Sequence, residues 1–326
     1  MKFKSKMQNT RKKNIHIYNF ILLIFISLCL YWDLNFDPND LQNPFLFWEL
    51  RVPRVMGAAV TGMALAMSGL MMQTLFRNPL AGPFLIGVTP GAGLAVALVT
   101  FASPFLLGQI FTSGISIIAA AFLGALGALI LQFIINRGYE GTHRLLLTGM
   151  ILSFVFSAIT ELLQQFAHSE QLRSFAFWGM GSFERIQNSH NFILLPIVLT
   201  SAMIIWFKRF ALDAYLLGDL YAESAGVNTK KTKRILILFT AILSALSTAF
   251  AGPIAFVGII APHLAKRTLN TDSHPKIIVN SLLWGMLICV FSDALAHRLI
   301  PDTVLQVNPI ISILGAPILL VSFLRK

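Results

Sequence analysis

The sequence predicts an all-α fold: a polytopic membrane bundle of about ten transmembrane helices with both termini in the cytoplasm. Of its 326 residues, 56% are hydrophobic and only 12% are charged, whereas soluble domains carry roughly 25% charged residues. The apolar residues lie in blocks of about 17–25 residues, the length that an α-helix needs to cross a bilayer. Most blocks are apolar on every side, whereas a surface helix of a soluble protein would show a polar face.

Ten apolar segments are the predicted spans, and they lie near residues 15–32, 53–75, 82–102, 112–136, 144–167, 189–207, 234–251, 253–265, 278–297 and 308–324. Residues 1–14 form a basic cytoplasmic tail before the first span. No small-x-small cleavage pattern follows that span, so it is expected to be an uncleaved helix. Residues 15–326 then form a single transmembrane domain. The eighth segment is too short to cross alone and is expected to pack inside the protein as a half-helix.

The distribution of basic residues predicts the orientation. Most of the 25 Lys and Arg residues fall in segments that the positive-inside rule then assigns to the cytoplasm. Nucleic-acid binding would also suit a net charge of +11, but it fits poorly with charge divided among short loops. Five basic residues fall on the outer side, and all are arginine: Arg51, Arg54, Arg173, Arg185 and Arg298. Snorkelling or local pairing would explain each one, and a docking face for an acidic partner would explain them together.

Helix-breaking residues interrupt the apolar pattern at two places, one in each half of the chain. They are Asn78, Pro79, Gly82 and Pro83 in the first half, and Gly252, Pro253, Pro262 and His263 in the second. Irregular backbone at membrane depth is tolerated only against protein or a wet cavity. Transporters place their substrate pathway at such discontinuous helices. Tightly packed or re-entrant turns that never contact a substrate are the other interpretation.

Small residues at helical spacing predict close helix packing. Two ridges of this kind follow the small-xxx-small pattern, with Ala58, Gly62 and Ala66 in one and Ala120, Gly124 and Ala128 in the other.

The sequence lacks the motifs of an enzyme. It has no Gly-Lys dipeptide and therefore no Walker-type phosphate loop, so ATP hydrolysis is expected on a separate subunit. No HExxH motif, paired-carboxylate site or disulfide framework is present, and no metal or cofactor is expected. Glu161 and Asp293 are the only acidic residues inside the predicted spans. Asp293 has His297 one turn on, within reach for a structural pair.

One connecting segment, residues 208–234, is long for a loop in a membrane bundle. Its middle, Leu216–Gly226, reads as a short helix that glycine ends. A surface amphipathic helix and a protruding helix pair that fits a cytoplasmic partner are both consistent with this pattern.

Four blocks carry a family resemblance, and they are RVPRVMGAAVTGMALAMSGLMMQTLFRNPLAGPFLIGVTPGAG (51–93), LLGDLYAESAGV (216–227), GPIAFVGIIAPHLAKR (252–267) and LGAPILL (314–320). Together the chain resembles the FecCD-type permease family, the membrane subunits of ABC importers for iron-siderophore complexes, haem and cobalamin. The match covers essentially the whole chain. It implies a permease that pairs with a second permease, two cytoplasmic ATPase subunits and an extracytoplasmic substrate-binding protein. Ferric siderophore is the expected cargo, with haem and cobalamin open.

The resemblance also implies site residues. Binding-protein docking falls on Arg51 and Arg54, with His297 and its neighbour Arg298 where the family often has another arginine. Coupling to the ATPases falls on helices at about 211–229, at Leu217, Gly218, Asp219, Ala222, Glu223 and Gly226. Before the last span, three residues of the family pattern are replaced by Val304, Gln306 and Asn308, which suggests a different ligand or a paralogous partner.

Two other function classes compete with this interpretation. A stand-alone secondary carrier or channel would carry more ionisable groups inside its spans. A membrane-embedded sensor would account for the missing active site but would leave the broken helices unexplained.

Overall fold

The computed structural model describes residues 2–34, 45–106, 114–137, 141–300 and 303–324, and within them the chain is helical with no named strand. The helices are α1 (Lys2–Leu34), η1 (Leu46–Arg51), α3 (Val52–Phe76), η2 (Pro83–Ile86), α4 (Val88–Leu106), α5 (Gly114–Ile135), α6 (Thr142–Gln165), α7 (Ser169–Gly179), α8 (Asn188–Phe207), α9 (Arg209–Leu216), α10 (Asp219–Ser224), α11 (Thr229–Ala251), α12 (Val257–Leu269), α13 (His274–Ala296) and α14 (Val307–Leu324). The all-α class is therefore confirmed.

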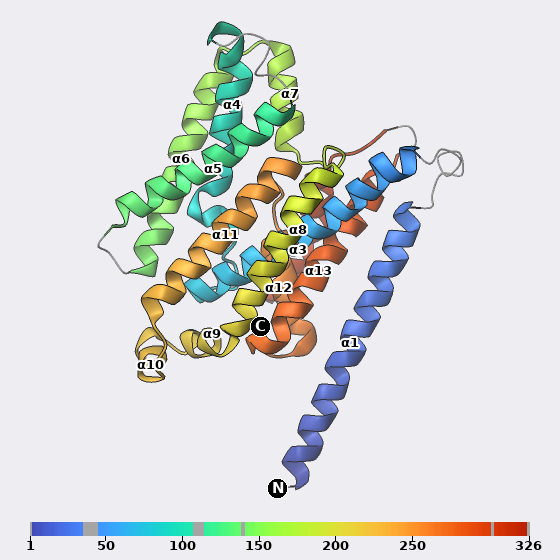
Figure 1. Ribbon diagram of the computed structural model, residues 1–326, viewed down its shortest axis with the longest axis vertical. Coiled ribbons are helices and arrows are strands. Elements are labelled where there is room, and N and C mark those ends of the chain that lie inside the picture. The colour runs from blue at the N-terminus through green and yellow to red at the C-terminus, as the bar shows by residue number, and fades with distance from the viewer. Residues whose placement is uncertain (1, 35–44, 107–113, 138–140, 301–302, 325–326) are drawn as a thin grey trace.

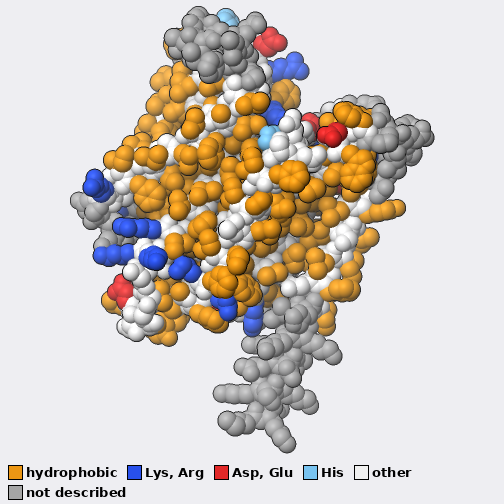
Figure 2. Space-filling view, in the orientation of Figure 1, with side chains coloured by type: hydrophobic (Ala, Val, Ile, Leu, Met, Phe, Trp, Pro, Cys, Tyr) orange, Lys and Arg blue, Asp and Glu red, His pale blue; other side chains and the backbone are white. Residues whose placement is uncertain are grey.

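Each of the ten predicted spans coincides with a helix. Seven helices are long and apolar enough to cross a membrane, and α4 and α14 are shorter apolar helices. The short eighth segment is α12, with 13 residues. The count of ten crossings stays a prediction. Apolar side chains cover most of the visible flank of the bundle, and Lys and Arg gather towards the end that carries α9 and α10 (Figure 2).

Helix α3 lies at the centre, packed against α8, α11, α12 and α13, and nearly all of its residues are buried. Close packing explains the first small-residue ridge, because a Cβ at Gly62 would lie 2.2 Å from the carbonyl oxygen of Gly285. The second ridge packs α5 on α4, since a Cβ at Gly124 would lie 2.4 Å from the carbonyl oxygen of Gly91. Both ridges therefore bring helix backbones close together, as the sequence predicts.

Helix α1 lies at the edge of the bundle, against α13 (Figure 1). It begins at Lys2, so residues 2–14 of the predicted tail continue the first span as helix. Leu22 and Ile26 are buried, while most other described side chains of α1 are exposed, as expected of a helix with lipid on one side. It also extends past the predicted end to Leu34, which places Asp33 on the helix.

The helices break where the first Pro-Gly cluster predicts. Helix α3 ends at Arg77, which has left-handed backbone angles (φ 49°). After the non-helical residues 78–82, η2 forms one short turn, and Gly87 (φ 74°) leads into α4.

The second predicted break is only partly right. Gly252 (φ 76°) ends α11, and residues 252–256 are non-helical. Pro262 and His263, however, lie inside α12. Pro262 cannot donate to the carbonyl of Gly258 one turn earlier, and that carbonyl oxygen instead abuts Gly69 of α3, where an added Cβ would approach it to 1.7 Å. Helix α12 continues through Pro262, with the Gly258 carbonyl packed closely against α3.

Candidate functional site

The two broken segments meet each other in the middle of the molecule. A small cavity of about 130 Å³ is lined by residues of both, with Pro83 and Phe84 from the first segment and Pro253, Phe256 and Gly258 from the second. The two breaks lie in separate halves of the sequence, but in the structure they line the same cavity and form one structural unit. It matches the arrangement in which transporters line a pathway with discontinuous helices.

The non-helical backbone of the second break is held by hydrogen bonds from outside it. The amide of Ala255 donates to Oδ1 of Asn308 at 2.9 Å. The amide of Ser182 donates to the carbonyl of Ala251 at 2.8 Å. Asn308 is one of the positions where the chain departs from the family pattern, and its side chain supplies an acceptor to a backbone group that no helix satisfies.

The segment expected to contact the ATPases forms two short helices, and the predicted single helix from Leu216 to Gly226 is wrong in its first half. Helix α9 ends before Gly218, whose φ of 124° breaks the chain direction, and α10 follows. Ala222 is fully buried and anchors α10, whereas Leu217 and Leu220 are 68% and 83% exposed. Exposed apolar side chains at a helix corner are typical of an interaction surface.

Glu223 and Gly226 fix the end of α10. The hydroxyl of Thr229 donates to the Glu223 carboxylate at 2.7 Å, and Gly226 has a φ of 80°. The carboxylate therefore joins α10 to the first turn of α11.

Asp219, the first residue of α10, is bound by two cations. Arg77 donates to one carboxylate oxygen, and Nζ of Lys233 lies 2.7 Å from the other. Burial alone would raise the pKa of Asp219, but these two hydrogen bonds hold it below its ordinary value. Arg77 also donates from Nε to the carbonyl of Tyr215 at 2.9 Å and lies over that ring, 4.5 Å from its centroid. Arg77 therefore ties both short helices to the end of α3.

A second contact ties α9 to the bundle. Nδ1 of His274, the first residue of α13, lies 2.6 Å from the carboxylate of Asp213, and the His274 amide donates to the same oxygen at 2.8 Å. Nε2 of His274 lies 2.9 Å from Oγ1 of Thr74 on α3. Sequence reasoning missed these residues, because nothing in their spacing links positions so far apart.

At the opposite end, Arg54 lies inside an ion cluster. Its Nη2 is 2.7 Å from Asp33 on α1, and its Nε is 3.0 Å from Asp293 on α13. The side chain of Arg54 is 12% exposed, and those of Asp33 and Asp293 are 1% and 0% exposed. Local pairing, one of the two explanations for the outer arginines, therefore applies to Arg54. The sequence analysis missed Asp33, because the predicted first span stopped one residue before it.

The other three predicted docking residues surround this cluster. Arg51 donates to the carbonyl of Leu34 at 3.2 Å, and Arg298 lies over the ring of Trp32, 4.3 Å from its centroid. Nδ1 of His297 is 3.6 Å from Asp293, so the predicted pair forms. The structure thus gathers residues from four separate segments into one region.

His297 also meets a loop residue that the sequence did not single out. Its Nε2 lies 3.4 Å from the carboxylate of Glu184. This hydrogen bond lowers the pKa of Glu184 below its usual value. Burial alone would lower the pKa of His297, but the bond to Glu184 and the charge of Asp293 raise it above the ordinary value.

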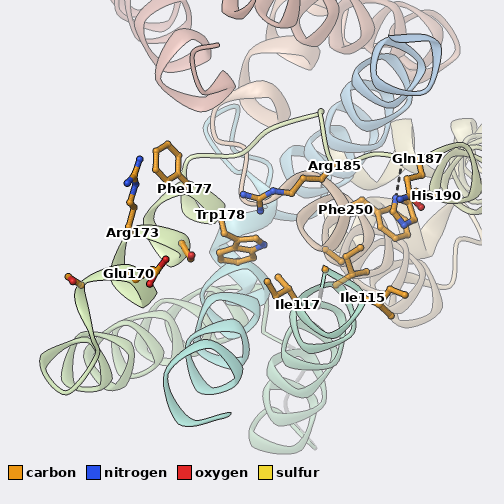
Figure 3. Close-up of a pocket in the computed structure, with 15 residues that line it drawn as sticks. Ile115, Ile117, Glu170, Arg173, Phe177, Trp178, Arg185, Gln187, His190 and Phe250 are labelled. Carbon is orange, nitrogen blue, oxygen red and sulfur yellow. Dashed lines mark hydrogen bonds between the residues drawn. The ribbon is translucent and has the colours of Figure 1, made fainter. Parts of the chain in front are cut away.

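An open pocket of about 1100 Å³ lies at the same end of the bundle. Helix α7, which the sequence analysis did not predict, forms one wall with Arg173 and Trp178, while Arg185 points into the space from the following loop (Figure 3). Neither guanidinium forms an ion pair with a described residue, and Arg173 lies 5.7 Å over the ring of Phe177. The pocket joins two of the outer arginines with aromatic side chains and with the carboxylate of Glu170.

Comparisons with known proteins agree on one family. The model of the FecCD transport family matches residues 15–325. The hemin transport system permease protein HmuU of Yersinia pestis is 34% identical, covering 90% of this chain and 86% of that protein. A vitamin B12 import system permease protein BtuC of Vibrio cholerae is 31% identical, covering 100% of this chain and 99% of that one. A solved structure described as an inward-facing metal-chelate type ABC transporter has a TM-score of 0.83 at 27% identity, covering 97% of this chain and 100% of that one.

Proposed function

Because this chain belongs to the FecCD transport family, we propose that it is the membrane permease subunit of an ATP-driven importer. The cargo that we propose is an iron complex, and more specifically a ferric siderophore. Its relatives are named for hemin and vitamin B12, and these are the alternative cargoes. It is a multi-pass membrane protein and a permease, so ATP hydrolysis belongs to a separate subunit. Two cytoplasmic ATPases, a second permease and an extracytoplasmic binding protein complete the importer that we propose.

The linkage between α9–α10 and the broken helices carries this proposal. Asp219 on α10 binds Arg77, the residue at which α3 ends and the first break begins. The same α3 contacts the second break, since Nε2 of Gln73 donates to the carbonyl of Ile259 at 3.1 Å. A force applied to α10 by an ATPase therefore reaches both breaks through one helix.

The exposed corner at Leu217 and Leu220 is the surface that we assign to the ATPase. Both side chains are apolar and largely exposed. Positive charge concentrates at the same end of the molecule (Figure 2). By the positive-inside rule this supports our assignment of that end to the cytoplasm, the side where ATP is available.

At the outer end we assign docking of the binding protein to the region of Arg51, Arg54, His297 and Arg298. Arg54 lies beneath this surface, where the buried carboxylates of Asp33 and Asp293 hold its side chain in place. Arg51 and Arg298 lie around it. Acidic side chains of a partner would find a cationic surface whose geometry is already fixed.

The open outer pocket supports an iron chelate as cargo. Its volume of about 1100 Å³ slightly exceeds the usual range of small-molecule sites, roughly 300–1,000 Å³. The guanidinium groups of Arg173 and Arg185 suit oxygen-rich anionic ligands, and Trp178 and Phe250 supply apolar contact area. We infer that cargo enters through this pocket before it reaches the broken helices.

The decisive experiment reconstitutes the permease with its ATPases and loaded binding protein in liposomes. Uptake should require ATP and stop with an ATPase that cannot hydrolyse it. The substitution Glu223→Lys should uncouple ATP hydrolysis from uptake, whereas Asp272→Lys, at an exposed position in the loop after α12, should leave coupling intact. Uptake that continues with the inactive ATPase, or that follows an ion gradient, would favour the secondary carrier and overturn the proposal.

The cargo is tested separately. A deletion strain should lose growth on a ferric siderophore as sole iron source and recover it when this chain is restored. Retained growth on every siderophore, with loss of growth on haemin or of cobalamin uptake, would replace the cargo assignment while leaving the importer proposal standing.

A further inference from the structure

A second pocket, of about 380 Å³, opens at the end of the bundle that carries α9 and α10. It lies between the end of α5, the start of α6 and the first turns of α11. Four basic residues line it: Arg137, Lys230, Lys233 and Arg234. None of its described lining residues is acidic. A concave site with this charge selects an anion.

The floor of this pocket is apolar. Leu75, Leu145 and Ile237 are buried and lie beneath the basic rim, and the partly exposed Phe133 stands on α5. A soluble anion gains nothing from such a floor, whereas a lipid places its phosphate at the rim and the first carbons of its acyl chains against the apolar residues.

The position of the pocket fits the same ligand. It lies where α5 ends and α6 begins, both of which are apolar enough to span a membrane, so its height matches the headgroup layer. The cytoplasmic leaflet is the one that displays anionic lipids, and the charge distribution assigns this end to the cytoplasm.

We propose that this pocket is a binding site for the phosphate headgroup of an anionic phospholipid. The chemistry that it recognises is a phosphate group attached to an apolar chain. Arg137 and Arg234 supply the contacts: both side chains are exposed, and neither forms an ion pair with a described residue. Lys233 borders the site while also binding Asp219.

Lipid binding to the full-length permease tests this site. The purified protein is titrated with cardiolipin and phosphatidylglycerol, and bound lipid is counted by native mass spectrometry. Each basic residue near a membrane surface contributes about fivefold in affinity, so Arg137→Gln with Arg234→Gln should weaken binding roughly 25-fold. The charge-preserving pair Arg137→Lys with Arg234→Lys should retain most of it.

A matched pair controls for overall charge. Lys208→Gln with Lys231→Gln removes two charges from the same end of the molecule without touching the pocket lining, and it should bind lipid almost as the parent does. Equal losses of lipid affinity in the two double variants would mean that overall charge attracts the lipid, and would overturn the proposed site.

Two further arms distinguish the source of the anion. Inorganic phosphate in millimolar excess should not displace the bound lipid. Efficient displacement would make this a site for free phosphate. Assembly with the ATPases should leave the lipid in place, and its loss on assembly would show that a partner's acidic side chain occupies the pocket instead.

Discussion

Two arginines, one at each end of the bundle, join helices through carboxylates in opposite surroundings. The partners of Arg54 are 1% and 0% exposed, whereas Arg77 and Asp219 are 36% and 40% exposed. Removing one member of a buried pair costs about 3–5 kcal/mol, while an exposed pair contributes about 0–1 kcal/mol. Breaking the cluster at Arg54 is therefore expected to destabilise the fold, whereas the cluster at Arg77 can be broken at little cost in stability.

The largest effect is expected at the buried cluster. Arg54→Gln would leave two buried carboxylates without their cation, and the free energy of unfolding should fall by about 3 kcal/mol or more. Thermal unfolding in detergent measures the change. Adding Asp33→Asn and Asp293→Asn should recover much of the loss, because neutral groups tolerate burial without a cation. A single variant as stable as the parent would show that the cluster does not hold the fold.

Helices α3 and α12 cross between the Arg54 and Arg77 clusters. A substitution at this crossing tests whether the two clusters act through one rigid core. Gly69→Ala would place a methyl group against the Gly258 carbonyl and should destabilise the protein by about 1–3 kcal/mol, with loss of uptake. Gly93→Ala on α4 is the control, since a Cβ there has no neighbour within 4 Å. Equal behaviour of the two variants would contradict the close crossing.

Asn308 tests how the non-helical backbone of the second break is held in place. Asn308→Ala removes the acceptor for the amide of Ala255 and should cost about 0.5–1 kcal/mol, because this hydrogen bond lies at an exposed position where water can replace the lost acceptor. Asn308→Asp keeps an acceptor and should retain more stability. Hydrogen exchange at Ala255 reports the contact directly, and unchanged exchange in the alanine variant would count against it.

The exposed cluster should behave in the opposite way to the buried one. Arg77→Gln should change the free energy of unfolding by less than about 1 kcal/mol and still lower the amount of cargo imported per ATP hydrolysed. Lys276→Gln, at the same end but on α13, should leave that ratio unchanged. A loss of stability as large as that of Arg54→Gln would contradict the difference between the exposed and the buried cluster.

The smallest effect is a pH dependence at the outer end. Because the pKa of His297 is raised in the folded protein, its contribution is full below the ordinary histidine pKa of about 6.5 and is lost as pH rises through the raised value. The pKa of Glu184 is lowered, so its contribution is lost only as pH falls through that lowered value. The free energy of unfolding should decline between pH 6 and 9, and His297→Gln should reduce this decline.

Hydrophobic blocks and helix breakers predicted the fold well, because membrane-spanning helices must satisfy their own backbone. The same reasoning located the small-residue ridges and the break after Arg77. It placed a break at Pro262 where none exists, since the sequence does not reveal that α3 lies against the carbonyl that this proline leaves unpaired.

The site was predicted less completely. Positive-inside counting singled out five outer arginines but did not separate Arg54, which is paired with two buried carboxylates, from Arg173 and Arg185, which face a pocket. That separation depends on the course of α1 and on helix α7. The contacts of Asp213 with His274 and of Arg77 with Asp219 join residues 61 and 142 positions apart, and a single sequence contains no signal for such pairs.

The position of Gly69 on α3 sets the scale of the movement. From Gly69 to Arg77 the helix rises about 12 Å, and residues 69–75 of this stretch are buried in the core. Close packing keeps a helix of that length from stretching or bending appreciably. In the importer that we propose, a displacement of α10 therefore reaches the crossing with α12 almost undiminished.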